Sequence, residues 1–205
     1  MLADAAKRRP VRPRHAASLL IVRPGPSGPE VLMGMRGAKH RFMPNRLVFP
    51  GGRVDPADHA AQAAAPLAPH TRALLERSAS PRLAHAIGIA VARELHEETG
   101  LTLGDPPALD GLHYLMRAIT PTSMPMRFHA RFLTVGHERV SGTLAGSGEL
   151  ENLRYYAVAE ALALDLADIT ELVLRHLLDF LAMPERERIE RNRTPFYSSR
   201  RWRME

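Results

Sequence analysis

Residues 93–101 read Arg-Glu-Leu-His-Glu-Glu-Thr-Gly-Leu and carry three glutamates within five positions. On a helix that turns by about 100° per residue, Glu94, Glu97 and Glu98 fall within an arc of roughly 100°. Their carboxylates would face one point in space, where like charges spaced three and four residues apart repel each other. A bound cation would relieve this repulsion, and a ligand set of oxygen atoms alone suits hard divalent ions such as Mg²⁺ or Mn²⁺.

A second stretch, residues 50–58, reads Pro-Gly-Gly-Arg-Val-Asp-Pro-Ala-Asp and follows a short apolar run. Because glycine has no Cβ atom, Gly51 and Gly52 can turn the chain sharply and bring backbone groups close to an ion or a phosphate. An ordinary tight turn is the alternative interpretation. The pairing of this turn with the acidic stretch downstream favours the functional one.

Together the two stretches resemble the signature of the Nudix family, in which a glycine and five residues lead to a glutamate, followed after seven residues by Arg-Glu-apolar-any-Glu-Glu-any-Gly-apolar. The second half matches from Arg93 to Leu101. The first half departs from it, since Asp58 stands where the family has glutamate. It lies 35 positions before Arg93 where the family pattern has eight, so 27 extra residues lie inside the motif. Family members with such an insertion, here about 59–83, are known, and it marks a subfamily.

The resemblance implies an α/β fold, a Nudix-type α/β/α sandwich with a mixed β-sheet between helices. It also implies a diphosphatase that uses Mg²⁺ or Mn²⁺ to cleave a nucleoside-diphosphate-X substrate. By position, the metal ligands would be Glu94, Glu97 and Glu98, and Glu97 or Glu98 could also take the proton of the attacking water. Arg93 would orient the glutamates.

The remaining candidate site residues lie outside the acidic stretch. Glu149 precedes an apolar segment, and this resembles the place where Nudix enzymes often carry a further acidic ligand or general base. An exposed loop glutamate is the alternative. Phosphate contacts are expected from three arginines and the two glycines of the turn: Arg36, Arg46, Arg53, Gly51 and Gly52.

The chain is similar, over roughly residues 17–183, to the Nudix branch that includes coenzyme A diphosphatases. The similarity lies in the runs 32–36, 42–45 and 49–52 and in Ile119-Thr120-Pro121 before Arg127-Phe128. It implies coenzyme A or acyl-coenzyme A as substrate, with 3′,5′-ADP and 4′-phosphopantetheine or its acyl form as products. ADP-ribose, dinucleotides and nucleoside triphosphates remain open. A homodimer is also suggested by the family.

The composition places the positive charge at the two ends of the chain. Of the net charge of +6, residues 1–14 hold +4 and residues 184–205 hold +3, which leaves −1 between them. We therefore expect a basic tail at 1–14, a Nudix domain at 15–183 and a second basic tail at 184–205. Basic tails around a neutral domain make nucleic acid an improbable partner and a small nucleotide-containing molecule the expected one.

Several classes of protein are excluded or disfavoured by what the sequence lacks. The 205 residues include no cysteine, which excludes disulfides, thiol nucleophiles and Cys-based zinc or iron–sulfur sites. No apolar run reaches about 18 residues, and the first residues lack the apolar core of a signal peptide. The expected protein is soluble and cytoplasmic, without a membrane partner.

A non-catalytic binding protein is the alternative class of function that could carry the same motif. A Nudix-fold binding module without catalysis could use its basic tails for RNA or an acidic partner, since residues 191–203 mix arginines with Tyr197 and Trp202. Three repelling carboxylates would serve no purpose in such a module, so the enzyme is the preferred interpretation. A solvated, glutamate-rich helix face is the remaining alternative for the triplet.

Periodicity and capping residues predict the main elements. Strands are expected at 17–22, 31–36, 47–49, 112–119 and 128–133, with 153–158 as the last strand. A short helix is expected at 71–77 and an amphipathic one at 170–183. The helix bearing the glutamates should span 81–99, with Ser80 as N-cap and Gly100 as the C-terminal glycine.

Overall fold

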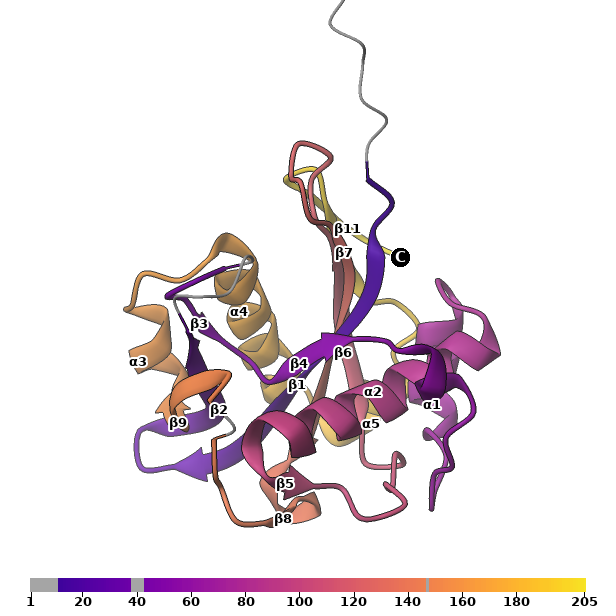
Figure 1. Cartoon of the computed structure of the whole chain (residues 1–205), viewed down its shortest axis with the longest axis horizontal. Coiled ribbons are helices and arrows are strands. Elements are labelled where there is room, and N and C mark those ends of the chain that lie inside the picture. The colour runs from indigo at the N-terminus through magenta and orange to yellow at the C-terminus, as the bar shows by residue number, and fades with distance from the viewer. Residues whose placement is uncertain (1–10, 38–42, 147) are drawn as a thin grey trace, which may run out of the picture.

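The computed structural model describes residues 11–37, 43–146 and 148–205. Residues 1–10 of the predicted N-terminal tail and the first residue of the run 42–45 lie outside these ranges. Figure 1 shows the arrangement of the elements. Within the described part of the chain, no helix combines the length and the apolar character needed to span a bilayer.

A mixed β-sheet forms the middle of the molecule. In the described residues it has nine strands, of which seven follow in the order β11-β10-β6-β7-β1-β2-β3, while β4 pairs with β1 and β9 with β2. The strands are β1 (Arg14–Gly25), β2 (Gly28–Arg36), β3 (Leu47–Val48), β4 (Gly51–Arg53), β6 (His113–Ile119), β7 (Phe128–Gly136), β9 (Leu150–Ala157), β10 (Pro195–Ser198) and β11 (Arg201–Met204). The pairs β1–β7 and β6–β10 are parallel and the others antiparallel. The predicted mixed sheet is confirmed.

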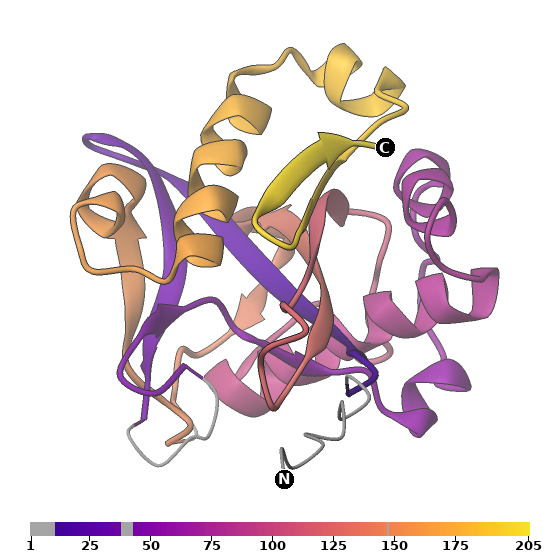
Figure 2. The same ribbon diagram turned by 90° about the horizontal axis from the view of Figure 1, so that it is seen from above.

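Strand β1 is the axis of the sheet. On one side it pairs with β7 from Arg14 to Val22, and on the other it pairs first with β4 and then with β2. Its first half thus holds β4, the short strand that begins with the double glycine. Figure 2 shows β1 running diagonally through the molecule.

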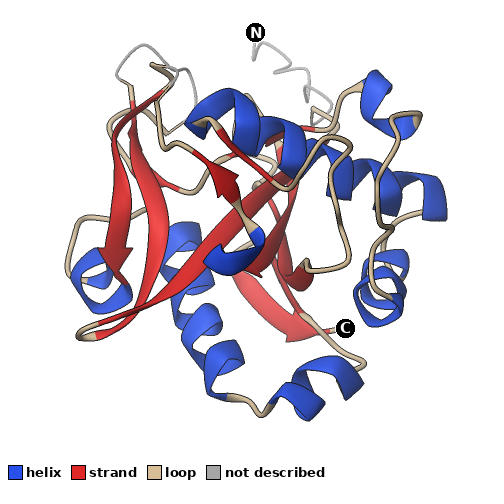
Figure 3. Cartoon of the chain, turned by 90° about the horizontal axis from the view of Figure 1, so that it is seen from below, coloured by secondary structure: helices blue, strands red, loops and turns tan. Residues whose placement is uncertain are grey.

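Helices cover both faces of the sheet (Figure 3). They are α1 (Pro69–Glu76), α2 (Pro81–Thr99), α3 (Val158–Leu162), α4 (Asp168–Ala182) and α5 (Glu185–Glu190). Successive side chains of β1 point to opposite faces: Leu19 and Ile21 belong to the core beneath α1 and α2, whereas Leu20 lies in the core beneath α3 and α4. The predicted sandwich of two helical layers around a sheet is confirmed.

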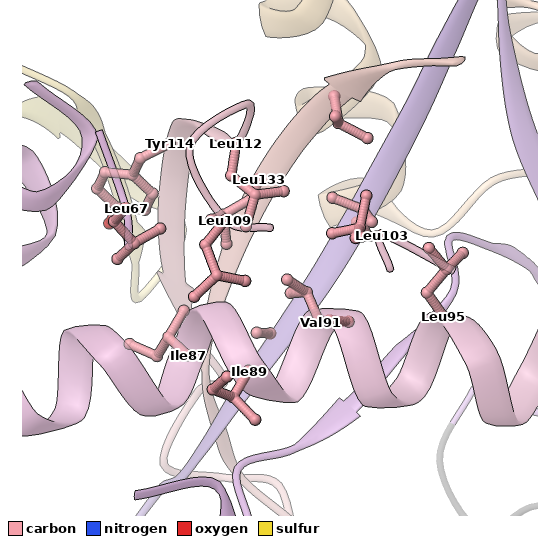
Figure 4. Packing of buried hydrophobic residues seen from close by; sticks show 14 of the residues in the cluster. Leu67, Ile87, Ile89, Val91, Leu95, Leu103, Leu109, Leu112, Tyr114 and Leu133 are labelled. Carbon is pink, nitrogen blue, oxygen red and sulfur yellow. The ribbon is translucent and has the colours of Figure 1, made fainter. Parts of the chain in front are cut away.

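Helix α2 begins and ends where its sequence predicts. Ser80 Oγ accepts a hydrogen bond from Leu83 N at 3.2 Å, Pro81 occupies the first helical position, and Gly100 ends the helix with φ 72°. Ile87, Val91 and Leu95 pack into the core between α2 and the sheet (Figure 4). Burial of this apolar face holds α2 against the sheet. The backbone that carries the glutamates of its last turns is therefore fixed in position.

The segment 59–83 contributes to the core. Leu67, Leu74 and Leu75 are buried in the same cluster as α2. The 3₁₀ helix η1 (Pro56–His59) leads into this segment, and α1 forms where the short helix was expected. The segment is therefore packed into the hydrophobic core of the domain through these leucines.

The C-terminal residues differ from the sequence prediction. The expectation that 153–158 is the last strand is wrong, because β10 and β11 follow it. Residues 184–205, expected to be a basic tail, form α5 and this strand pair, and β10 joins the sheet beside β6. A further small sheet, β5 (Leu101–Thr102) with β8 (Ser141–Gly142), was not predicted either; two-residue strands carry no periodicity to detect.

Candidate active site

The double-glycine turn lies directly against the acidic end of α2. Gly51 N donates a hydrogen bond to Glu98 Oε2 at 2.8 Å. A Cβ atom built on Gly52 would stand 2.1 Å from Glu94 Oε1, so only glycine leaves room for that carboxylate. The two stretches that were distant in the sequence therefore form one site.

Arg93 holds three side chains of this site together. Its Nη1 donates to Glu94 Oε1 and to Glu97 Oε2, each at 2.9 Å, and its Nη2 donates to the Arg53 carbonyl at 2.9 Å. Its Nε and Nη2 bind the two oxygens of Asp58 at 3.0 and 3.2 Å. Burial by itself would lower the pKa of Arg93, but the hydrogen bond to Asp58 and the charge of Glu94 raise it overall, so the guanidinium stays charged.

Asp58 acts as the anchor of Arg93. Its side chain is 2% exposed, and besides Arg93 it accepts a hydrogen bond from Asp55 N at 2.7 Å. In the sequence, Asp58 stands out only as a departure from the family pattern, and no role in the site was predicted for it. Its place in the motif was the available signal: at that position an acid can fix the arginine of the second half.

Burial and mutual repulsion make ionisation of the glutamates unfavourable. Burial raises the pKa of Glu98 to about 8, opposed by the hydrogen bond from Gly51 and reinforced by the charge of Glu94. The pKa of Glu94 is also raised, first by burial, against the lowering effect of Arg93. Glu149 adds negative charge at both positions. We call the group formed by Glu94, Glu98 and the nearby Glu149 the acidic corner. When these carboxylates are ionised, their negative charge exceeds the positive charge that the protein places beside them.

The structure places Glu149 beside Glu94 and Glu98 in this corner. Its carbonyl accepts a hydrogen bond from Gly37 N at 3.4 Å, which ties the loop to the end of β2. Arg36, the last residue of β2, is close enough to Glu98 for its charge to lower the pKa of that carboxyl. Within the described residues its buried Nε has no hydrogen-bond partner.

Arg46 and Arg53, two arginines predicted to contact phosphate, have other surroundings than Arg36. Arg46 forms an ion pair with Asp165 at 2.5 Å, and its Nη1 also donates to the Asp165 carbonyl at 2.9 Å. This holds it against the loop between α3 and α4. Arg53 is exposed at the end of β4, and its carbonyl rather than its side chain contacts Arg93.

The donor chemistry of the corner fits a hard divalent cation. No three histidine or carboxylate side chains among the described residues stand in an arrangement that encloses a metal ion, and Arg93 supplies the positive charge beside them. Within the same residues, Glu94 Oε2 and Glu98 Oε1 take no hydrogen bond. These carboxylate oxygens, with Glu149 nearby, are the kind of ligands that Mg²⁺ and Mn²⁺ prefer.

Comparison with known proteins shows the fold. No family model and no curated protein matches the chain. Among solved structures, a NUDIX hydrolase from Alicyclobacillus acidocaldarius is similar with a TM-score of 0.64 and 23% identity, over 80% of this chain and 90% of that one. A MutT NUDIX hydrolase from Burkholderia pseudomallei is similar with a TM-score of 0.53 and 22% identity, over 82% and 99%.

A third similar structure is the NUDIX domain of Shewanella oneidensis NrtR, crystallised with ADP ribose. Its TM-score is 0.53 at 14% identity, over 84% of this chain and 90% of that one. The chain therefore has the Nudix fold, as expected from its motif.

Proposed function

We propose that this chain is a metal-dependent Nudix diphosphatase that hydrolyses a diphosphate linkage in a nucleotide-containing substrate. The observation that carries the proposal is the contact between the two halves of the motif, in which Gly51 N binds Glu98 and the Gly52 backbone leaves room for Glu94. A purely structural turn would need neither contact. The Nudix fold, shared with hydrolases, supports the same activity.

Each residue of the corner has a distinct part in this proposal. Glu94 and Glu98 would hold Mg²⁺ or Mn²⁺, with Glu97 joining them by releasing Arg93. A bound divalent ion neutralises charge on the leaving phosphate and lowers the pKa of an attacking water. Glu149, or whichever of Glu97 and Glu98 is not bound to metal, would accept the proton of that water.

Arg93 and Asp58 would position the glutamates without touching substrate. Because Arg93 contacts Glu94 and Glu97 at once, its loss would disturb both carboxylates. Arg36 is the arginine best placed to meet a phosphate group, since it lies near Glu98 and its Nε has no partner among the described residues. The exposed Arg53 could add a second contact, whereas Arg46 would first have to leave Asp165.

Coenzyme A or acyl-coenzyme A is the substrate we propose first, with ADP-ribose second. The similarity of residues 17–183 to the coenzyme A diphosphatase branch supports the first choice. The second is favoured by the ADP ribose bound to the NrtR domain, which shares the fold. All these molecules share a diphosphate next to adenosine, so the proposed chemistry is the same.

The test is product release from a panel of coenzyme A, acyl-coenzyme A, ADP-ribose, NADH, diadenosine polyphosphates and nucleoside triphosphates, with Mg²⁺ or Mn²⁺. Wild type is compared with Glu97→Gln, Glu98→Gln and Glu149→Gln, and with Glu138→Gln as a matched control on an exposed glutamate. We expect Glu98→Gln to lose at least about 100-fold in kcat and Glu138→Gln to keep full activity.

A wild-type protein that binds the metal but cleaves nothing on the panel would refute the diphosphatase proposal. The non-catalytic binding module would then become the better explanation. Equal activity in wild type and Glu98→Gln would instead place the reaction at another site.

A further inference from the structure

A pocket of about 220 Å³ lies between α1 and the end of α5, on elements that the proposed reaction does not use. His70, Arg77, Arg191 and Asn192 supply its polar lining. Ala73, Leu74 and Ile189 supply its apolar lining. Its walls come from the segment 59–83 and from the C-terminal segment, the two parts of the chain to which the sequence motif gives no role.

The lining carries positive charge that no carboxylate balances. Among the described residues, the ion pairs of α1 and α5 are Arg72–Glu76 and Arg186–Glu190, and neither includes Arg77 or Arg191. Arg77 is exposed, and its side chain makes no hydrogen bond within the same residues, although its backbone N–H donates to the Leu75 carbonyl. A guanidinium with all its donors free beside a pocket is suited to bind an oxyanion in the fork geometry.

Arg191 is the partly buried arginine of this lining. Its Nη2 donates to the Tyr114 carbonyl, and its guanidinium lies 4.8 Å from the centre of the Phe180 ring. Burial lowers the pKa of Arg191 to about 10, and the nearby Tyr114 counteracts this only in part. A desolvated cation without an acidic partner is costly, and an anion in the pocket would relieve that cost.

Two neutral histidines lie beside the arginines of the pocket. His70 Nε2 and His113 Nδ1 lie 3.2 Å apart in a hydrogen bond, so the ring of His70 is held at the pocket wall. Burial, together with the charge of Arg191, lowers the pKa of both imidazoles. Each is a neutral hydrogen-bonding group near pH 7 that an adjacent anion would help to protonate.

We propose that this pocket is a second ligand site that binds the phosphate group of a small phosphorylated metabolite. Arg77 and His70 contact the phosphate, Arg191 contributes charge from the inner wall of the pocket, and Asn192 donates from its amide. The apolar wall made by Ala73, Leu74 and Ile189 holds the short organic part of the metabolite. A phosphate is favoured over a carboxylate because its greater charge and three terminal oxygens match several donors converging from two elements.

The experiment is isothermal titration of the full-length protein with inorganic phosphate and, separately, with the monoester propyl phosphate, whose short chain is apolar. EDTA is present, because without a divalent metal the acidic corner of the proposed active site repels anions. We expect both probes to bind at low millimolar concentration, and the monoester to bind more tightly because its organic part contacts the apolar wall. Arg77→Gln should weaken binding about tenfold or more.

Arg72→Gln is the matched control, because it removes an exposed arginine of the same helix that does not line the pocket. It should leave phosphate binding unchanged. The diphosphatase activity of Arg77→Gln should also equal that of wild type, which separates this site from the proposed active site.

Two outcomes would overturn the proposal. One is the absence of binding to wild type at about 10 mM of either probe. The other is equal weakening by Arg72→Gln and Arg77→Gln, which would mean general attraction to a basic surface. Neither outcome affects the proposed diphosphatase, whose test uses metal and different residues.

Discussion

Alanine at Gly51 and alanine at Gly52 should act on different properties of the protein. Gly51 has φ +153°, and a Cβ atom there would stand 2.4 Å from the Ala17 carbonyl oxygen and 2.6 Å from Ser18 Cα. These are backbone atoms of β1, which cannot move without disturbing the centre of the sheet. The unfavourable φ costs about 1–2 kcal/mol, and forced overpacking adds about 1–3 kcal/mol. Gly51→Ala should therefore lower the free energy of unfolding by about 2–5 kcal/mol.

At Gly52 the new methyl group would meet the Glu94 carboxylate, 2.1 Å from its Oε1 atom. This is the end of a flexible side chain, so it can turn away at a cost of about 1 kcal/mol or less. Turning away breaks its hydrogen bond to Arg93 and removes a proposed metal ligand. Because a displacement of about 1 Å can cost about 100-fold in rate, Gly52→Ala should fold almost normally and lose about 100-fold in kcat/KM.

Gly28→Ala provides the control for the conformational effect alone. Gly28 has φ +117° at the β1–β2 turn, and no heavy atom lies within 4 Å of the position of its Cβ. It should lose only about 1–2 kcal/mol of stability and keep full activity. Urea unfolding measures stability, and initial rates on the best substrate of the panel measure activity. Full activity in Gly52→Ala would refute the inference that the turn and Glu94 must fit together, and wild-type stability in Gly51→Ala would refute the packing of the turn on β1.

Three further predictions concern the anchor, the C-terminus and pH. Arg93→Lys should lower the free energy of unfolding by about 2–4 kcal/mol in urea, because the buried Asp58 carboxylate loses a two-pronged partner; an unchanged midpoint would contradict this. Deleting residues 184–205 should lower Tm or abolish cooperative melting by circular dichroism, because β10 pairs with β6; a truncated protein with the wild-type Tm would show that the strand pair adds nothing. Mainly through burial, the pKa of His113 is lowered to about 4 and that of His129 to about 3 from the usual 6.5. The unfolded chain therefore binds these protons first, so the stability that these histidines contribute above pH 6.5 should be lost as the pH drops from 6.5 towards 4, by about 1 kcal/mol for each partly exposed histidine at pH 5, while the raised pKa of Glu98 acts in the opposite direction. The measurement is therefore the difference in urea-unfolding free energy between wild type and each of His113→Gln and His129→Gln in phosphate-free buffer, and a difference that is the same at pH 7 and pH 5 would disagree.

The elements that were predictable are those whose chemistry is local. Ser80 caps α2 through its own hydroxyl, Gly100 ends it through a backbone angle that glycine adopts freely, and the apolar residues between them repeat at helical spacing. Strand β1 could be recognised from its apolar run, although its ends reach Arg14 and Gly25, beyond the predicted 17–22. Each of these signals lies within the element that it specifies.

The elements that escaped prediction depend on distant partners. Strand β10 contains the buried Phe196, but it lies among arginines and becomes a strand only by pairing with β6, about 80 residues earlier. Arg46 had the composition of a phosphate ligand, and only the fold shows that Asp165, 119 residues later, binds it. Spacing predicted that the glutamates of α2 converge, but it could not show which of their neighbours hold them.

The contact between Asp58 and Arg93 explains how the motif tolerates the long separation of its halves. After the glycine turn the chain forms η1 and α1 and then returns to the site through α2. The guanidinium of Arg93, on α2, binds both oxygens of the buried Asp58 carboxylate and so joins the two ends of this segment. The leucines of the segment 59–83 pack on α2 at the same time, so the segment is fixed at its base and along its length. A shorter acid suffices at position 58 because η1 brings its carboxylate to Arg93, while Glu94 and Glu98 face the turn. Asp58 therefore serves the site through Arg93, which is why its replacement should alter stability and glutamate geometry together.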